Sequence, residues 1–353
     1  MSTYQQEDQL RRLVTILCDQ PPFCSGTFPI TSNNSILYYG KGNPAGRIDL
    51  LNASDEELKH LTEACDPATF GMDRKDVLDE TYRRAGKLDA AHFAVKFDAE
   101  RSGLLRVVRS GLLEGFDEKK PTSAELYKLN VYGKDSFFKA HKDTPRSKTM
   151  FGSLVIVFPT PHEGGAFSLR QNDKKWVFDS SKLLVDQQEP CIAYIAFYSD
   201  VEHEVALVTS GYRVTITYNL YFSESPSPSE IAAAHPLSAI ERELKTAFQS
   251  LLDDPTFMPE GGHLGFGLRH QYPIPSTDND PDVLEDLEDR LKGSDAALMM
   301  VCRELGLDAS LKMAFEDEEK LVVVMCDYAF NFDQAYVEDP SWISCAGNMV
   351  AWL

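Results

Sequence analysis

The stretch that decides the fold is FFKAHKDTPRSKTMFGSLVIVF, residues 137–158. Its second half is a run of β-branched and aromatic residues that predicts a buried strand. Just before that run, His141 and Asp143 stand two positions apart. Residues two apart on a strand point the same way, so an imidazole and a carboxylate would converge on one point. The spacing raises the hypothesis of a metal site, which needs a third ligand.

Short strand-like segments surround this stretch from about residue 124 to residue 222. Turn residues bound each of them, and their close spacing predicts a β-sandwich or barrel. The segments are YKLNVY (127–132), GSLVIVF (152–158), GGAFSLR (164–170), KWVFD (175–179), CIAYIAFY (191–198), HEVALV (203–208) and YRVTITYNLYF (212–222).

The best candidate for the third ligand is His203, at the start of one of these strands. Two imidazoles and one carboxylate on one side of a metal leave open positions opposite, an arrangement that suits non-haem Fe(II) and oxygen chemistry. Arg213 follows ten positions later, on a strand whose alternation places Arg213, Thr215 and Thr217 on one face. A guanidinium grips a carboxylate through two parallel hydrogen bonds, so Arg213 is a suitable anchor for an acidic co-substrate, with a further bond from Thr215.

The combined pattern resembles the iron(II)- and 2-oxoglutarate-dependent dioxygenases, especially their prolyl 4-hydroxylase-like branch. The resemblance covers residues 124–222 and is carried by HxD, a Gly-Gly pair before a strand, a distal histidine and an arginine ten positions on. It implies an α+β fold with a double-stranded β-helix, or jelly-roll, core braced by helices, an N-terminal helical region and an α/β C-terminal extension.

The resemblance also implies roles for individual residues. His141, Asp143 and His203 would bind iron, and Arg213 with Thr215 would bind the far carboxylate of 2-oxoglutarate. The family often has a further tyrosine that contacts the co-substrate; Tyr132 lies about there, and Tyr127 is its rival. The cofactors implied are Fe(II), 2-oxoglutarate and O2, with ascorbate as a candidate reductant. The reaction implied is hydroxylation of an unactivated C–H bond while 2-oxoglutarate is converted to succinate and CO2.

Two other functions remain open on sequence alone. The same His-Asp-His set with water also describes a catalytic zinc site, which makes a metallohydrolase the main alternative. A binding protein that keeps the fold without turnover is another. The substrate is a protein, a peptide or a small molecule, and a prolyl residue is the first candidate. His162, Arg170 and Trp176 are candidate pocket residues whose simpler interpretation is a surface turn, a solvent-facing cation and a packed aromatic.

The rest of the chain predicts supporting structure. We expect a mainly helical region at 1–120, packing on a catalytic core at 121–222, then a linker at 223–234 and an α/β extension of unknown role at 235–353. The expected helices lie at 8–19, 54–65, 73–85, 102–114, 235–252 and 295–306, and strand-like sequence returns at 321–332. Ser54 and Glu57 form a capping-box pattern.

Composition narrows the partners and the compartment. The formal charge of −20 repels phosphate backbones, so no nucleic-acid partner is expected; it is compatible with a basic protein partner and equally with solubility alone. The N-terminus lacks the features of a secretory signal and no apolar run reaches membrane-spanning length, which predicts an intracellular protein, cytoplasmic or nuclear. Seven scattered cysteines without a CxxC pair argue against a disulfide framework. The oligomeric state is left open.

Overall fold

The computed structural model describes residues 3–42, 45–72, 75–113, 120–185, 187–223, 237–272, 283–317 and 322–326. Contacts divide the described chain into two units. The β unit contains residues 21–113 and 120–223, and the helical unit contains the first 20 residues together with those from 237 onward. The domain boundaries expected near 120, 222 and 234 stay a prediction.

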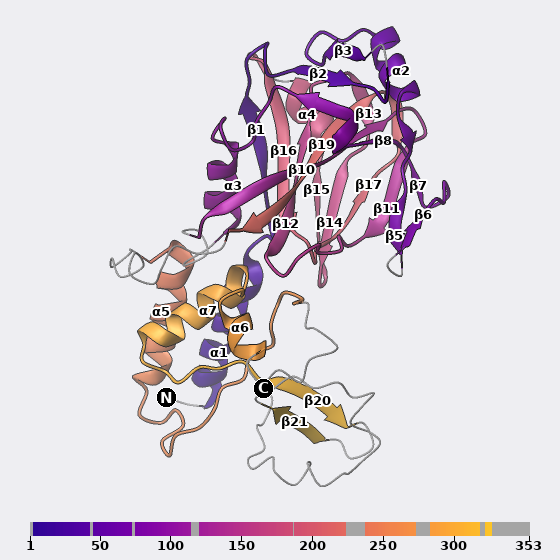
Figure 1. Cartoon of the computed structure of the whole chain (residues 1–353). Helices are drawn as coiled ribbons and strands as arrows, with labels where there is room; N and C mark the ends of the chain where they lie inside the picture. Colours follow the sequence, from indigo (N-terminus) through magenta and orange to yellow (C-terminus); the bar gives the residue numbers. More distant parts are fainter. Residues whose placement is uncertain are drawn as a thin grey trace. The chain divides into compact units, whose positions relative to one another are not determined.

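A seven-stranded antiparallel sheet forms one layer of the β unit (Figure 1). Two of its central strands, Met150–Val157 and Cys191–Tyr198, are buried at every position, so both faces of the sheet are covered there. In spatial order the strands are β1 (Phe23–Pro29), β16 (Cys191–Tyr198), β12 (Met150–Val157), β19 (Arg213–Phe222), β10 (Thr122–Tyr132), β8 (Gly86–Asp89) and β4 (Asp66–Pro67).

A five-stranded antiparallel sheet forms the opposing layer. Its order is β15 (Lys174–Phe178), β14 (Phe167–Gln171), β17 (Glu202–Val205), β11 (Phe137–His141) and β7 (Arg83–Arg84). One hydrophobic cluster contains buried residues of both sheets, for example Leu154 and Ile216 from the larger sheet and Phe167 and Leu169 from the smaller. The chain therefore has the jelly-roll core that the sequence predicted. Six of the seven predicted segments each overlap one strand of the two sheets, whereas HEVALV (203–208) is divided between the end of β17 and the start of a further strand at Val208.

Smaller elements surround this sandwich. The additional strands are β2 (Ile36–Tyr39), β3 (Gly46–Asp49) and β9 (Phe93–Val95) in one sheet, β5 (Phe70–Met72) with β6 (Lys75–Val77), and β13 (His162–Gly164) with β18 (Val208–Gly211). The helices are α2 (Asp55–Glu63), η1 (Ala90–His92), α3 (Leu104–Leu112) and α4 (Ser180–Val185). Helix α2 begins at the predicted capping box of Ser54 and Glu57, and α3 packs against β1, β10 and β16.

The helix predicted at 73–85 is wrong. The described part of that stretch contains β6 and β7 instead. The Asp79 carboxylate accepts hydrogen bonds from the backbone N–H and hydroxyl of Thr81, which favours a turn over a helix. Tyr82 then donates its hydroxyl hydrogen to the carbonyl of Ala140, 58 positions away. Tertiary contacts override the helical propensity of this segment.

The helical unit is built from the N-terminal helix and from the C-terminal part of the described chain. It contains α1 (Thr3–Asp19), α5 (Ala239–Leu252), α6 (Val283–Glu288), α7 (Gly293–Glu304) and the hairpin β20 (Met313–Asp317) with β21 (Val322–Cys326). Leu13 and Ile16 of α1 are buried with Leu244 and Phe248 of α5 and with Val301 of α7. The predicted helices at 8–19, 235–252 and 295–306 are confirmed. The predicted linker from residue 224 onward and residues 327–332 lie outside the described residues.

Two further predictions from the sequence concern disulfides and membrane-spanning helices. No disulfide joins any of the six cysteines that the structure describes. Among the described helices, none combines the length and apolarity needed to span a lipid bilayer.

Candidate metal centre and active site

The three predicted metal ligands come together in the smaller sheet. His141 is the last residue of β11, Asp143 follows it by two positions, and His203 lies on the neighbouring strand β17. The antiparallel register pairs His141 directly with His203, so both side chains project from the same face. A register irregularity between Phe138 and His141 adjusts the direction of β11 just before the ligand.

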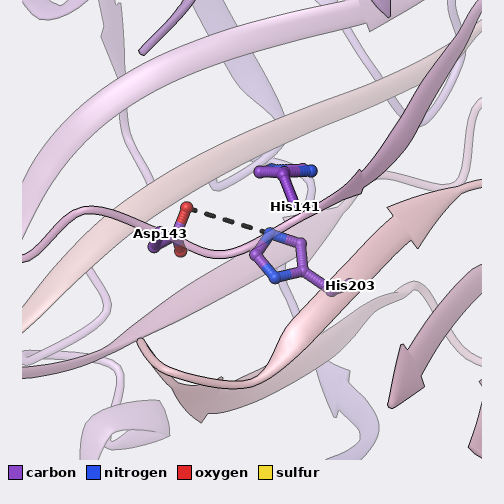
Figure 2. A group of neighbouring side chains, drawn as sticks. All are labelled: His141, Asp143 and His203. Carbon is purple, nitrogen blue, oxygen red and sulfur yellow. Dashed lines mark ion pairs between the residues drawn. The ribbon is translucent and has the colours of Figure 1, made fainter. Parts of the chain in front are cut away.

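The ligand atoms of these three side chains all lie within 4.8 Å of one another (Figure 2). His203 Nε2 is 3.8 Å from Asp143 Oδ1, and the centroids of the two imidazole rings are 4.2 Å apart. Three donor atoms that are each roughly 2 Å from one ion lie no more than about 4 Å apart. The ligand atoms are therefore close to the spacing that one metal ion needs.

Both histidines are oriented by the backbone. His141 Nδ1 lies 2.8 Å from the carbonyl oxygen of Lys139, and His203 Nδ1 lies 3.0 Å from that of Val201. A carbonyl oxygen can only accept, so Nδ1 carries the hydrogen and the neutral ring presents the lone pair of Nε2. Each histidine thus has a fixed tautomer suited to binding a metal through Nε2.

Burial keeps His141 in the neutral form. Desolvation, and then the charge of His203, lower the pKa of His141 to about 3. Aromatic rings supply much of this apolar environment: Phe138 stacks on His141 with ring centroids 3.6 Å apart, and Phe167 stacks on His203 at 5.3 Å. A metal ion meets no competing proton at His141 near neutral pH.

Asp143 is oriented from the other sheet. The hydroxyl of Ser153, on β12, donates to Asp143 Oδ2 at 2.5 Å. Ser153 is 1% exposed, so its hydroxyl has few alternatives to this bond. One carboxylate oxygen is held by the serine, and Oδ1 is left facing the histidines.

Arg213 is a buried cation without a counter-charge. It is the first residue of β19, is 1% exposed, and no described carboxylate lies within ion-pair distance. Its Nε and Nη2 have no hydrogen-bond partner among the described residues. Burial lowers the pKa of Arg213 to about 10. An unpaired buried charge is costly, so this side chain is suited to an anionic ligand that completes its bonds.

The Gly-Gly pair leaves room for this arginine. Gly164 and Gly165 have φ angles of +75° and +66°, in the left-handed region that favours glycine. A Cβ at Gly165 would lie 2.8 Å from Arg213 Cδ and 2.9 Å from Val208 Cγ2. The pair thus combines a backbone requirement with close packing against the guanidinium stem.

One cavity of about 370 Å³ connects the ligand cluster with Arg213. The face of β19 that carries Arg213, Thr215 and Thr217 lines it, as the strand alternation predicted. Thr215 is buried and its hydroxyl lies 3.4 Å from the carbonyl oxygen of Asn130. The structure therefore brings the three metal-type residues, the arginine and the threonine to one space.

The two candidate tyrosines lie in different parts of this cavity. Tyr132, 4% exposed, pairs with Arg213 in the register of β10 and β19, and the guanidinium carbon is 5.6 Å from its ring centroid. Tyr127 is half-buried and accepts a hydrogen bond from Arg146 at 2.5 Å. Tyr132 is the tyrosine beside Arg213.

Two residues of the site were missed by the sequence analysis: Arg83, which lines the cavity, and Ser153, which bonds to Asp143. Arg83, 7% exposed, donates to the carbonyl of Thr69 at 2.6 Å and to Asn130 Oδ1 at 2.7 Å, and its guanidinium lies 4.2 Å from the Phe138 ring centroid. No sequence signal marks Arg83, because it lies in the stretch that reads as a helix. Ser153 could have been noticed as the polar residue within a buried apolar strand.

The remaining candidates have structural roles. His162 bonds through Nδ1 to the carbonyl of Thr160 at 2.7 Å, and Arg170 forms ion pairs with Glu202 and Glu204. Trp176 packs edge-to-face on Phe23. None of the three lines the cavity. Trp176 is a packed aromatic as expected, but His162 lies on strand β13 and not in a surface turn, and Arg170 is ion-paired.

The fold and the cluster define a class: a jelly-roll protein with a two-histidine, one-carboxylate facial site beside a buried arginine. The family model described as the 2OG-Fe(II) oxygenase superfamily matches residues 127–221. This chain therefore carries a 2OG-Fe(II) oxygenase domain, and the sequence-based prediction of a 2-oxoglutarate-dependent dioxygenase is confirmed. No curated protein matches the chain.

Solved structures show distant similarity. A Pseudomonas putida prolyl-4-hydroxylase is 16% identical, with 60% of this chain and 100% of that chain covered and a TM-score of 0.35. A Trichoplax adhaerens prolyl hydroxylase, solved with a peptide fragment of the hypoxia inducible factor oxygen degradation domain, is 15% identical, with 63% and 94% covered and a TM-score of 0.35. A 2OG-Fe(II) oxygenase family oxidoreductase from Burkholderia pseudomallei is 15% identical, with 62% and 92% covered and a TM-score of 0.29.

The residues present fit the cofactors that this superfamily implies, which are Fe(II), 2-oxoglutarate and O2. Two neutral imidazoles and one carboxylate are a donor set that Fe(II) accepts while keeping open positions. The unpartnered nitrogens of Arg213, in the same cavity, match the requirement of a dicarboxylate for a bidentate partner. A role for ascorbate stays a prediction.

Proposed function

We propose that this protein hydroxylates an unactivated C–H bond, using His141, Asp143 and His203 to hold Fe(II) and Arg213 to hold 2-oxoglutarate. One observation carries the proposal: the ligand cluster and a buried guanidinium, whose Nε and Nη2 have no partner among the described residues, open into the same cavity. A metal site alone fits many reactions, but the added buried cation requires an anion beside the metal. Thr215 and Tyr132, which adjoin Arg213 in the cavity, would complete the anion site.

The overall reaction balances without another reactant. When bound, Fe(II) and 2-oxoglutarate supply the activation of O2, and one oxygen atom enters the substrate C–H bond while the other enters succinate as CO2 leaves. The chain contributes geometry. The serine bond to Asp143 and the backbone bonds to the histidines hold the donors, and Phe138, Phe167 and Phe197 pack around the imidazoles and exclude water.

The first substrate to test is a prolyl residue in a peptide. The sequence motif resembles the prolyl 4-hydroxylase-like branch, and this resemblance is the basis for the choice, since a fold alone hosts many substrates. A cavity of about 370 Å³ is within the range of ligand-sized sites, so it can admit one side chain beside the co-substrate.

The direct test is anaerobic spectroscopy. Fe(II) and 2-oxoglutarate added without O2 are expected to produce a weak visible charge-transfer band in the intact protein and none in His141→Ala or Asp143→Ala. His162→Ala is the matched control, because His162 has the same Nδ1 bond to the carbonyl two positions earlier but lies outside the cavity. No band in the intact protein would contradict the proposal.

The same protein preparation can be used to distinguish the oxygenase from the alternative function, a zinc hydrolase. That function gives Arg213 no task, although the side chain is fully buried without an ion pair among the described residues. Hydrolytic activity supported by zinc and unaffected by 2-oxoglutarate would favour it. Succinate formation that depends on both Fe(II) and O2 would exclude it.

A further inference from the structure

The charge of the active-site cavity is opposite to that of the chain. The whole sequence has 35 basic and 55 acidic residues. Among the described residues that line the cavity, five side chains are basic and two, Asp79 and Asp143, are acidic. An acidic protein that gathers cations around its reaction site is arranged for an anionic ligand there.

The proposed cofactors account for only part of this charge. Fe(II) and 2-oxoglutarate carry equal and opposite charges, and Asp143 and Arg213 also cancel. Arg83 remains, together with Lys128, Lys142 and Arg146, against Asp79. The Asp79 carboxylate is engaged by the N–H and hydroxyl of Thr81. A positive charge therefore remains after the co-substrate has bound.

Three of these cations lie toward the opening. Lys142 and Arg146 are exposed and Lys128 is half-buried, whereas Arg83 is buried deeper beside Phe138. Lys142 and Arg146 belong to the segment that follows β11, so they lie within a few residues of the metal-type ligands. A substrate entering over the metal site passes them.

Arg146 and Lys128 are grouped around one aromatic ring. Arg146 donates to the hydroxyl of Tyr127 and its guanidinium carbon lies 4.4 Å from the ring centroid, while Lys128 Nζ lies 4.5 Å from the same centroid. A bulge in β10 at this point lets Tyr127 and Lys128, which are adjacent in sequence, both line the cavity. Among the described residues, no carboxylate forms an ion pair with either cation; the nearby Glu125 accepts from Tyr221 and Asn219.

We propose that Lys128 and Arg146, arranged around Tyr127, bind a carboxylate of the substrate, so that this oxygenase acts on acidic substrates and first of all on an acidic peptide segment. The inference rests on the proposed function and adds the substrate class to it. The ring of Tyr127 aligns the cations, and their charges remain available to an incoming anion.

The test compares peptides that differ only in charge. Three fluorescein-labelled pentapeptide mixtures carry a central proline flanked by Asp and Glu, by Asn and Gln, or by Lys and Arg. Each is titrated by anisotropy against the full chain with Fe(II) and 2-oxoglutarate under nitrogen. Because exposed ion pairs contribute little individually, we expect the acidic mixture to bind roughly tenfold more tightly than the amide mixture. The advantage should shrink in 0.5 M salt, a concentration chosen to screen exposed charges.

A charge reversal locates the effect. Arg146→Glu is expected to abolish the preference for the acidic mixture, whereas Lys148→Glu is expected to retain it. Lys148 is the matched control because it lies on the same exposed segment but does not line the cavity. Small carboxylic acids, such as N-acetylproline, form a second arm. If only the small acids bind, and their binding depends on Arg146, the cations still bind a substrate carboxylate, but the substrate is a metabolite and not a peptide.

No binding in either arm would overturn the inference. Equal binding of the acidic and amide mixtures, or stronger binding of the basic mixture, would also overturn it unless N-acetylproline binds in a manner that depends on Arg146. The charge-transfer band shows whether such a result concerns only the substrate or the proposed oxygenase function as well. If the band is present and the acidic preference is absent, the substrate inference alone is wrong. If the intact protein gives no band, the oxygenase assignment of the site is wrong.

Discussion

Replacement of Ser153 by alanine tests whether the seven-stranded sheet orients a metal ligand of the five-stranded one. Asp143 lies beyond the end of β11, so no strand pairing fixes its side chain. The hydroxyl of Ser153 holds the carboxylate instead, through a hydrogen bond of 2.5 Å to Asp143 Oδ2. In Ser153→Ala the carboxylate can rotate, and the oxygen that faces His203 is no longer held in position.

The expected size of the effect follows from the type of bond. A hydrogen bond to a charged group contributes about 1.5–3 kcal/mol, and loss of a bond that orients a metal ligand typically weakens metal binding about 10–100-fold. We expect the dissociation constant for Fe(II) to rise within that range in Ser153→Ala. The serine is 1% exposed, so water cannot readily replace its hydroxyl.

The assay is an anaerobic titration of Fe(II) against a chromophoric chelator. Ser199→Ala is the matched control, because Ser199 is also 1% exposed but its hydroxyl donates to the carbonyl of Phe151, at 3.4 Å, and to no carboxylate among the described residues. Ser199→Ala should bind Fe(II) as the parent does. Affinity in Ser153→Ala within twofold of the parent would refute the reasoning, since Asp143 would then be held by something else or would not bind the metal.

Three further predictions concern the arginine, the glycine pair and acid stability. Arg213→Met should abolish the rise in melting temperature that 2-oxoglutarate produces, yet leave the ligand-free protein at least as stable. The reason is that burial lowers the pKa of Arg213 to about 10, which corresponds to a penalty of roughly 3 kcal/mol for keeping the side chain charged. A lower melting temperature of the ligand-free variant would contradict this. Gly165→Ala should weaken 2-oxoglutarate binding, because the added Cβ would displace Arg213. Gly42→Ala should leave binding unchanged, because a Cβ there meets nothing within 4 Å. Calorimetry measures both affinities, and equal affinity of Gly165→Ala and the parent for 2-oxoglutarate would refute the reasoning. The metal-free protein should lose stability as the pH falls from about 6.5 toward 3. The folded state lowers the pKa of His141 from 6.5 to about 3, so in that pH range the unfolded chain binds a proton that the folded chain does not. Urea titrations should show a flatter dependence of stability on pH in His141→Gln, and the same dependence as in the parent would contradict the prediction.

Much of the β unit follows from local sequence signals. Alternation along YRVTITYNLYF predicted which face of β19 carries Arg213 and Thr215, and both line the cavity. The capping box at Ser54 predicted the start of α2. These signals succeed because strand alternation and helix capping depend on residues close together in the chain.

The error at 73–85 shows where local signals fail. Tyr82 packs against Phe70 with ring centroids 4.4 Å apart, and Arg83 donates a hydrogen bond to Asn130, 47 positions away. Such long-range contacts outweigh helix propensities, which amount to tenths of a kcal/mol per residue. The sequence carries no pattern that announces them in advance.

By itself the sequence determined the identity of the candidate ligands, since the two-residue spacing of His141 and Asp143 and the ten-residue spacing of His203 and Arg213 are properties of the chain. Their roles in binding Fe(II) and 2-oxoglutarate stay predictions. Only the tertiary structure decided that Ser153 reaches Asp143 and that a cluster of cations lines the cavity of an acidic protein. The physical reason is that these neighbours belong to different strands, or to the segments between them, and which of their side chains meet is set by strand register and by the packing of two sheets, which no spacing along one strand contains.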